Sequence, residues 1–328
     1  MRWFCCLLLL LWMPSLPARE AACQRPRLAS VLPVPPAAPG ETAIATQNLW
    51  RLFDDADNGP GEAVAPAEYR RRLAKWSAQL REVLRAPAIV AVQEAENLAV
   101  LEALAAQVAA DGGPRYRPLL VEGPDVGGID VGYLVAEPWQ VEAVTPILAS
   151  RRRGPAPLFD RPPLHLVLTG PGPQRLELVN VHLKSLHGSE QPGRAEAVRG
   201  KRAAQAGALA VWVRDTLRAR PAAPLLLLGD FNATPEVLGG VDVLGELAAA
   251  GLTLLTTRLP ADQRYTYVHA CRPEAIDHLL AAPALLPQVA GIAASRGNAD
   301  GHPRFRQLPG PVRASDHDGL VLFLRPPQ

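Results

Sequence analysis

Short apolar runs and longer amphipathic stretches follow one another along most of the chain, from residue 42 to residue 324. Short apolar runs bounded by turn residues are typical of buried strands, and apolar residues spaced three or four apart predict helices that face a core. Helices are predicted over Glu68–Leu84, Leu98–Ala109 and Gly193–Arg218. Strands are predicted over Thr42–Ala45, Ala88–Val92, Arg117–Val121, Asp130–Val135, Leu164–Leu168, Leu176–His182, Leu225–Leu228, Ile276–Leu280 and Leu320–Leu324. Strands in both halves with long helices between them favour an α+β fold of two packed sheets flanked by helices.

Residues 1–23 depart from this pattern and have the three parts of a secretory signal. Arg2 precedes an apolar stretch from Trp3 to Met13, and small residues follow just before Cys23. The stretch is shorter than the roughly 20 apolar residues that cross a bilayer. We therefore expect export, to the periplasm or the extracellular medium. The alternative is lipid anchoring at Cys23, which Glu20 disfavours because bacterial lipoprotein signals have an aliphatic residue at that place.

Composition predicts a linker and one folded domain after the signal. Residues 24–40 are rich in proline and alanine and are predicted to be a linker, and residues 41–328 are expected to form a single catalytic domain. With 48% hydrophobic and 20% charged residues, a chain of this size can bury a large core without a metal or disulfide scaffold. The formal net charge of +2 does not by itself indicate nucleic-acid binding. We expect a monomer without a transmembrane helix.

Cysteine usage leaves one question open. Removal of the signal would take away Cys5 and Cys6 and leave Cys23 and Cys271. These two could form a disulfide in an oxidising compartment, or Cys271 could be a lone thiol. Neither arrangement requires a catalytic cysteine.

Polar residues directly follow several of the predicted strands. Asn48 and Glu94 come after the first two strands, and Gly229 leads the strand Leu225–Leu228 into Asp230 and Asn232. Carboxylate and carboxamide oxygens suit Mg²⁺, and histidines beside them can stabilise charge while a phosphate ester is cleaved. Each residue alone would also be typical of a turn or a loop cap, so the indication comes from the combination. The sequence has no Cys/His cluster with the spacing of a zinc site.

The set of motifs, in this order, resembles the endonuclease/exonuclease/phosphatase superfamily. The resemblance rests on the following segments: Gln47–Leu49, Gln93–Glu94, Gly128–Val131, Val179–Lys184, Gly229–Asn232, Ile276–His278 and Ser315–Asp318. Within that superfamily the chain is most similar to bacterial secreted nucleases, which share Gln47–Leu49, His182–Ser185 and Arg202–Ala206. The resemblance implies a four-layer αββα sandwich of two mixed sheets flanked by helices, with the active site where loops from both sheets converge.

The resemblance also implies a role for each site residue. Asp230 would be the base that prepares the attacking water, and Asn232 would orient that base or the phosphate. Glu94 and Asp316 would hold Mg²⁺ or Mn²⁺, and Asn48 beside Glu94 would contact either the ion or the phosphate. The remaining expected roles are His317 oriented by Asp277, His182 supported by Asp130, and phosphate contacts from Asn180, Lys184 and Arg202.

The motifs indicate the substrate less directly than they indicate the type of reaction. Secreted nucleases of this type commonly have an arginine where this chain has Gly127, so a positive side chain near the phosphate is missing or replaced. Arginine groups elsewhere could bind a nucleic-acid backbone, although any single group is also typical of a solvated surface. We expect an exported, metal-dependent phosphodiesterase acting as a nonspecific nuclease on DNA. The alternatives are a phosphatase or phospholipase of the same fold, and a catalytically silent binding module.

Overall fold

The protein is described from a computed structural model that covers residues 27–57, 59–171, 174–237 and 240–327. Two six-stranded sheets pack face to face. The first sheet runs in the order β15 (Val289–Ala294), β16 (Leu320–Leu324), β1 (Thr42–Leu52), β2 (Ile89–Ala95), β4 (Asp130–Ala136) and β3 (Tyr116–Leu120). The second runs β11 (Thr253–Leu254), β14 (Asp277–Ala281), β10 (Leu225–Asp230), β9 (Arg175–His182), β8 (Leu164–Thr169) and β5 (Gln140–Pro146). Both sheets are mixed, because β1 with β2 and β9 with β10 are parallel pairs among antiparallel ones.

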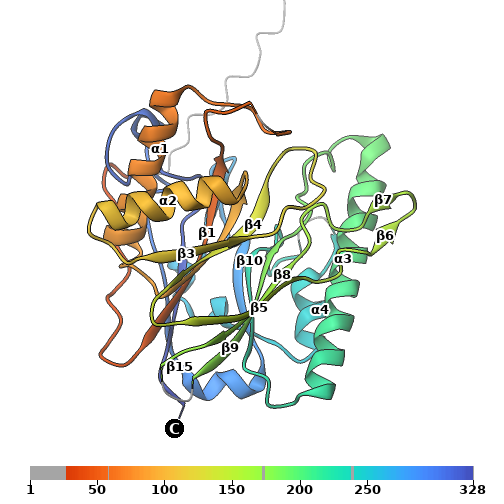
Figure 1. Ribbon diagram of the computed structural model, residues 1–328. Helices are drawn as coiled ribbons and strands as arrows, with labels where there is room; N and C mark the ends of the chain where they lie inside the picture. The colour runs from red at the N-terminus through yellow and green to blue at the C-terminus, as the bar shows by residue number, and fades with distance from the viewer. Residues whose placement is uncertain (1–26, 58, 172–173, 238–239, 328) are drawn as a thin grey trace, which may run out of the picture.

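Helices cover the outer face of each sheet (Figure 1). The first sheet is covered by α1 (Pro66–Ala78), which continues as a π-helical turn η1 (Gln79–Val83), and by α2 (Leu98–Ala110). The second is covered by α3 (Pro192–Ala219) and α4 (Val243–Ala249). Short pieces complete the order: the β-hairpins β6 (Arg152–Arg153) with β7 (Ala156–Pro157) and β12 (Tyr267–His269) with β13 (Arg272–Glu274), and the 3₁₀ turns η3 (Leu255–Arg258), η4 (Ala261–Gln263), η5 (Pro283–Gln288) and η6 (Pro303–Gln307). The four-layer αββα sandwich is therefore confirmed.

Three apolar layers hold the sandwich together. On β10, Leu226 and Leu228 face the first sheet, whereas Leu225 and Leu227 face the helices α3 and α4. Both faces of the strand are buried, and this explains why the sequence reads as a continuous apolar run rather than an alternating one. On the other side of the molecule, Trp76 of α1 packs against the first sheet.

The predicted helices and strands are confirmed, with shifted ends. The first strand extends to Leu52 because its last residues carry polar site positions that the apolar pattern did not include. Besides the short strands and 3₁₀ turns, three longer elements were not predicted from the sequence: β5, β15 and α4. Their segments have weak periodicity or small residues, and they take their structure from the neighbours on which they pack.

Part of the segment predicted to be a linker packs on the domain instead. Leu28 and Leu32 form β-bridges with Gly301 and Arg296, and Val34 is only 2% exposed. Val34 belongs to the core beneath η1, where its backbone N–H donates to the carbonyl of Val83 at 3.0 Å, whereas the side chain of Leu32 is exposed. The predicted signal, residues 1–23, lies outside the described residues.

Cys271 is disulfide-bonded, so it is not the lone thiol of the second alternative. Cys23 lies outside the described residues, and its pairing with Cys271 stays a prediction.

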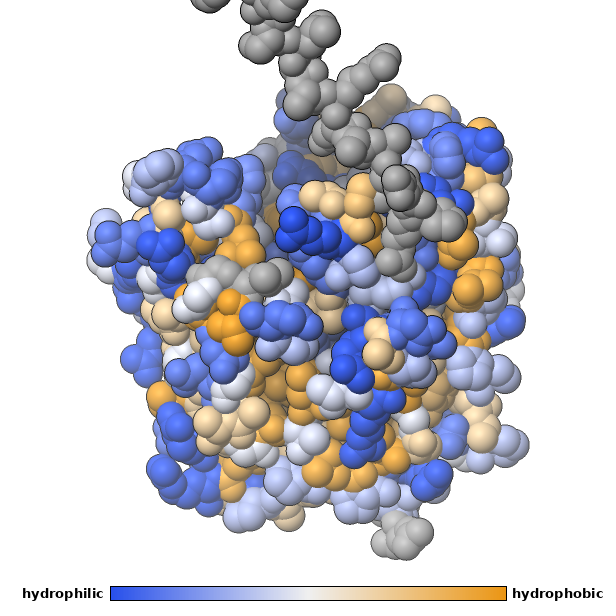
Figure 2. All heavy atoms as spheres, turned by 180° about the vertical axis from the view of Figure 1, so that it is seen from behind, coloured by the Kyte–Doolittle hydropathy of each residue, from blue (hydrophilic) through white to orange (hydrophobic). Residues whose placement is uncertain are grey.

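The surface is mixed in character. On the face seen in Figure 2, hydrophobic residues gather toward the lower centre and hydrophilic residues surround them. Among the described residues, none of the helices has both the length and the apolar character needed to cross a bilayer.

Candidate active site

The carboxyl ends of β1, β2, β9 and β10 meet at one edge of the two sheets. Parallel neighbouring strands bring the residues at their ends together, which is where sites form in such sheets. A cleft of about 870 Å³ lies at this edge, and six of the predicted residues line it: Glu94, His182, Asp230, Asn232, Asp316 and His317. The two sheets therefore contribute opposite walls of one pocket.

Gly229 allows β10 to enter this edge so close to β9. Its φ is 135°, and a Cβ atom there would lie 2.1 Å from the carbonyl oxygen of Val181. No other residue can take this place without moving the strands apart. The glycine before Asp230 is thus required by the packing of the two parallel strands.

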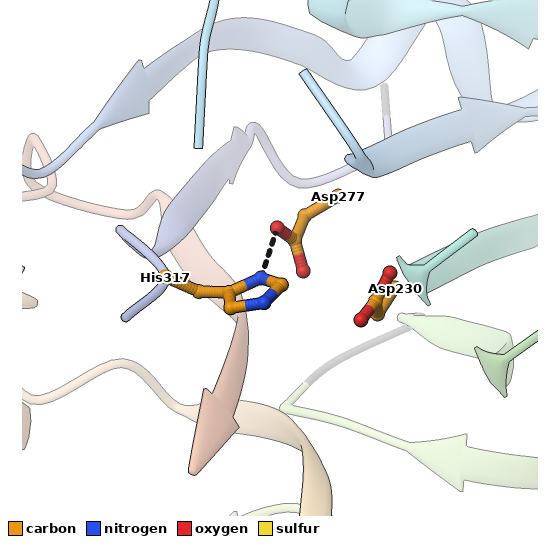
Figure 3. A group of neighbouring side chains, drawn as sticks. All are labelled: Asp230, Asp277 and His317. Carbon is orange, nitrogen blue, oxygen red and sulfur yellow. Dashed lines mark hydrogen bonds and ion pairs between the residues drawn. The ribbon is translucent and has the colours of Figure 1, made fainter. Parts of the chain in front are cut away.

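Asp277 and His317 form a buried pair in the cleft. His317 donates from Nδ1 to Oδ2 of Asp277 at 2.8 Å, and Asp230 lies alongside with its carboxylate near the ring (Figure 3). Burial alone would lower the pKa of His317, but the carboxylate of Asp277, with those of Asp316 and Asp230, outweighs it and raises this pKa well above its ordinary value. His317 is therefore an imidazolium at neutral pH. The Tyr267 ring packs on it with a centroid distance of 4.9 Å.

Asp230 is held as an acceptor beside this cation. The backbone N–H of Asn232 donates to its Oδ1 at 2.8 Å, and His182 Nε2 lies 3.5 Å from its Oδ2. Burial, followed by the charge of Asp277, raises the pKa of Asp230 to about 7. A carboxyl with a pKa near neutrality can both accept and release a proton at physiological pH. Asn232 orients this carboxyl through its backbone, while its side chain donates to the carbonyl of Leu183.

Asp230, Asp277 and His317 are close enough to be considered as a cation site, since one ligand atom of each lies within 4.8 Å of the others. The hydrogen bonds of this group favour a role in proton transfer over a role in binding a metal ion. Asp277 uses Oδ2 on His317, and an imidazolium has no lone pair for a metal. Among the described residues, Asp230, Asp277 and His317 are the group of three or more histidine, cysteine or acidic side chains whose ligand atoms lie this close together.

Glu94 and Asp316 form the part of the cleft that fits a divalent cation. Burial, and then the charge of Asp316, raises the pKa of Glu94. Within the described part of the chain, neither carboxylate forms an ion pair with a lysine or an arginine. Two adjacent acids without a cationic partner are unfavourable unless a cation joins them. The residues present therefore fit Mg²⁺ or Mn²⁺.

Asn48 lies at the same place but presents a donor. Its Nδ2 is 3.1 Å from Glu94 Oε1 and 3.3 Å from Asp230 Oδ2, while its Oδ1 accepts from the backbone N–H of Trp50. In this arrangement Asn48 joins the two carboxylates to each other. To bind an ion, as predicted, it would have to turn its carbonyl oxygen toward them.

His182 is in the cleft, but Asp130 does not support it. Burial, with the charges of Arg161, His317 and Lys184, lowers the pKa of His182 well below its ordinary value, so it is neutral. Its Nδ1 is buried without a hydrogen-bond partner. Asp130 accepts instead from the backbone N–H of Gly123, at 2.9 Å. The predicted Asp130–His182 pair is wrong, because β4 directs this carboxylate toward the loop before it.

Asn180 is not a phosphate contact. It is fully buried, and its Nδ2 donates to the carbonyls of Val92 and Gly132, both at 2.8 Å. Its Oδ1 accepts from Gln93 at 2.7 Å. Asn180 therefore joins β9 to β2 and β4 across the interface of the two sheets.

Arg202 is not a phosphate contact either. It is 2% exposed and donates from Nη1 to the backbone carbonyl of Lys184, while Gln205 accepts from the backbone N–H of the same residue. Helix α3 thus holds the chain where it leaves β9. The side chain of Lys184, predicted to bind phosphate, is half-buried and lies near Ser185, outside the lining of the cleft.

Arg161 lines the cleft and was not found from the sequence. It forms an ion pair with Asp125 at 2.5 Å, and its charge influences both Glu94 and His182. It follows no strand pattern and belongs to no motif, so only the fold identifies it. Arg161 supplies a positive side chain in this region, whereas Gly127, at the position where similar nucleases commonly have an arginine, does not.

Comparisons with known proteins agree with this geometry. The model of the endonuclease/exonuclease/phosphatase family matches residues 45–317, most of the chain. Similar solved structures include the human nocturnin catalytic domain with bound sulfate, with a TM-score of 0.59 at 16% identity over 92% of this chain and 98% of that one. A TDP2 from D. rerio complexed with a single-strand DNA product has 0.56 at 18% identity, covering 87% and 99%. The 3' phosphatase NExo from Neisseria bound to a product DNA hairpin has 0.55 at 17% identity, covering 86% and 98%.

At these identities the solved structures establish the fold alone, and none of the curated proteins matches. The family model covers the whole span from the first site strand to His317. The chain belongs to the endonuclease/exonuclease/phosphatase family, whose members are metal-dependent hydrolases of phosphoric esters.

Proposed function

We propose that this protein is an exported, divalent-metal-dependent phosphodiesterase that acts as a nonspecific nuclease on DNA. The observation that carries the proposal is the shared cleft, in which an acid pair that fits a cation, Glu94 with Asp316, faces a buried imidazolium and a carboxyl acceptor. Of the solved structures of similar fold, a TDP2 and NExo are complexed with DNA products. Export rests on the signal pattern of residues 1–23.

Each side chain of the cleft has its own role in the in-line attack of water on phosphorus. Asp230, held by the N–H of Asn232, accepts the proton of the attacking water. The imidazolium of His317, held by Asp277, donates a hydrogen bond to a phosphoryl oxygen as negative charge develops there. Neutral His182 can donate a second hydrogen bond from Nε2. As the bond from phosphorus to water forms, the bond to the leaving oxygen breaks; that oxygen takes a proton from solvent, and Asp230 later releases the proton of the attacking water to solvent.

Glu94 and Asp316 would hold the cation, and Mg²⁺ or Mn²⁺ bound there would offset the negative charge of the phosphate. The amide of Asn48 donates to both Glu94 and Asp230 and so fixes the base relative to the acid pair.

The test is hydrolysis of plasmid DNA by the purified mature protein with Mg²⁺, with and without EDTA. Glu94→Ala and His317→Ala are expected to reduce kcat by at least about 10²-fold, because each removes a group that stabilises developing charge. Glu82→Ala is the matched control, since Glu82 is exposed on η1 and pairs only with Arg81. Near-parental rates in both variants, on equal amounts of folded protein, would refute the assignment.

A substrate panel separates the alternatives. We expect turnover of DNA, and turnover of sphingomyelin or of a phosphomonoester without turnover of DNA would assign the site to a phospholipase or a phosphatase. Absence of any chelator-sensitive hydrolysis would leave a binding module. Cleavage of both circular and linear DNA would identify an endonuclease.

A further inference from the structure

A strained β-bulge lies beside the acid pair. The register of β1 against β2 shifts between Asn48 and Leu52, and within this bulge Trp50 and Arg51 have φ values of 53° and 52°. Left-handed backbone is unfavourable for large side chains. Such strain persists only where surrounding contacts impose it, and bulges next to active sites direct side chains out of the sheet.

Contacts on two sides hold the bulge. Arg72 donates to the backbone carbonyls of Trp50 and Arg51, the latter at 2.6 Å. Burial, with the charge of Arg306, lowers the pKa of Arg72 to about 10, which leaves it protonated at neutral pH. On the other side, the backbone N–H of Arg51 donates to Glu94 Oε2 at 2.9 Å. The same bulge therefore fixes a predicted metal ligand and the side chains of Trp50 and Arg51.

The bulge presents an aromatic ring covered by arginines. The guanidinium groups of Arg306 and Arg313 lie 4.0 Å and 5.2 Å from the centroid of the Trp50 ring, and Arg51 lies over Phe53 at 4.9 Å. Stacking orders a guanidinium group without neutralising its charge. Within the described residues, none of these three arginines forms an ion pair with a carboxylate. We call Trp50, Arg51, Arg306 and Arg313 the Trp50 patch.

The Trp50 patch borders the cleft on the side of the acid pair. Arg51 is bonded to Glu94 through its backbone, and Arg313 is close enough to Asp316 for the two charges to interact. Arg51 and Arg306 are exposed. Lys75 fixes the segment that carries Arg306, because its Nζ donates to the carbonyls of Phe305, Leu308, Gly310 and Val312 at 2.7–3.0 Å.

Arg313 donates from Nη1 to the backbone carbonyls of Asn298 and Ala299, at 2.6 Å and 3.1 Å. Ordered guanidinium groups that no carboxylate neutralises, next to a phosphate-cleaving site, are suited to further phosphates. A small phosphate ester has one phosphate, which the cleft accommodates, whereas a nucleic-acid strand carries one every 3.4 Å or so along its axis. We propose that the Trp50 patch binds the phosphates of a polynucleotide strand next to the scissile phosphate, on the side of Glu94 and Asp316. The proposal rests on the nuclease function proposed above, and it makes an extended strand the substrate class.

The test measures binding apart from hydrolysis. A fluorescein-labelled single-stranded DNA 12-mer is titrated with Asp230→Asn protein and Mg²⁺, by anisotropy, at several salt concentrations. Adding Arg306→Gln is expected to raise Kd about tenfold, because a charge-assisted contact is lost, and to reduce the slope of log Kd against log salt by about 0.7. Adding Arg51→Gln as well is expected to reduce the slope by a similar further amount.

Arg218→Gln in the same background is the matched control. It removes the same charge from an exposed position near the end of α3, about 24 Å along the helix from Arg202 at 1.5 Å per residue. Equal effects of Arg306→Gln and Arg218→Gln, or no effect of Arg306→Gln, would overturn the proposal. Hydrolysis of bis(p-nitrophenyl) phosphate and of DNA by the parent protein is measured in parallel. Failure of both reactions would defeat the nuclease function, while the binding data would still decide on the Trp50 patch.

Discussion

Replacing Asn180 with alanine should strongly destabilise the protein without changing its chemistry. The side chain makes three buried hydrogen bonds between the sheets, to Val92, Gly132 and Gln93. Leaving a buried polar group unsatisfied costs about 1–3 kcal/mol. The two carbonyls lose this donor, while Gln93 still donates to Thr46 at 3.1 Å, so Asn180→Ala should reduce the free energy of unfolding by roughly 2–6 kcal/mol. Domains have only about 5–15 kcal/mol in total.

Urea unfolding followed by tryptophan fluorescence measures this loss, and Gln107→Ala is the control. Gln107 is a carboxamide on α2 that bonds only to Asp111 at the surface, and its removal should cost no more than about 0.5 kcal/mol. Rates are then compared per folded molecule at low temperature, where we expect kcat within a few-fold of the parent. An Asn180→Ala protein with parental stability and a 10²-fold lower kcat would show that Asn180 contacts the phosphate after all.

Three further outcomes follow from the charges and contacts. Burial raises the pKa of Asp130 from 3.8 to about 7, so its contribution to stability is complete below pH 3.8 and is lost as pH rises through 7. Asp130→Asn should therefore flatten the fall in unfolding free energy between pH 5 and pH 8, by at most about 3 kcal/mol, and parallel urea curves would contradict this. Asp277 raises the pKa of His317, so Asp277→Asn should move the alkaline limb of kcat/KM to lower pH, and an unmoved limb would show that another group titrates there. Lys75→Met leaves four carbonyls of residues 305–312 without their donor and should lower the free energy of unfolding by about 3 kcal/mol, whereas parental stability and unchanged proteolysis of that segment would disprove this role.

The sequence predicts the site as far as strand geometry allows. Asp230 and Asn232 were expected at the end of a buried strand, and the end of β10 brings both into the cleft. Asn180 and His182 were expected on one face of β9, and the contacts of both point toward the first sheet. The two residues lie at different depths between the sheets, because two positions along a strand span about 6.6 Å. That distance places His182 at the open edge and Asn180 inside the interface.

Depth along a strand cannot be obtained from an alternation pattern. It depends on where the opposite sheet ends, which is set by contacts between residues far apart in the chain. The same reason explains Arg202, which was expected to contact phosphate but is buried, and Arg161, which reaches the cleft from a loop. Motif order found the groups that carry the chemistry, while the packing of the layers decides which of them meet the substrate.

The interface between the sheets therefore sets the geometry of the site as well as the stability of the fold. Gln93 bonds to Asn180 across this interface, and the next residue is Glu94, whose φ of 60° and bulge turn it out of the strand and into the cleft. His182 and Asp230 belong to the other sheet. A shift of one sheet against the other would move Glu94 away from these two residues before it exposed any apolar core. Since interior packing permits few such shifts, the buried hydrogen bonds of Asn180 act on catalysis only through the position of the sheets.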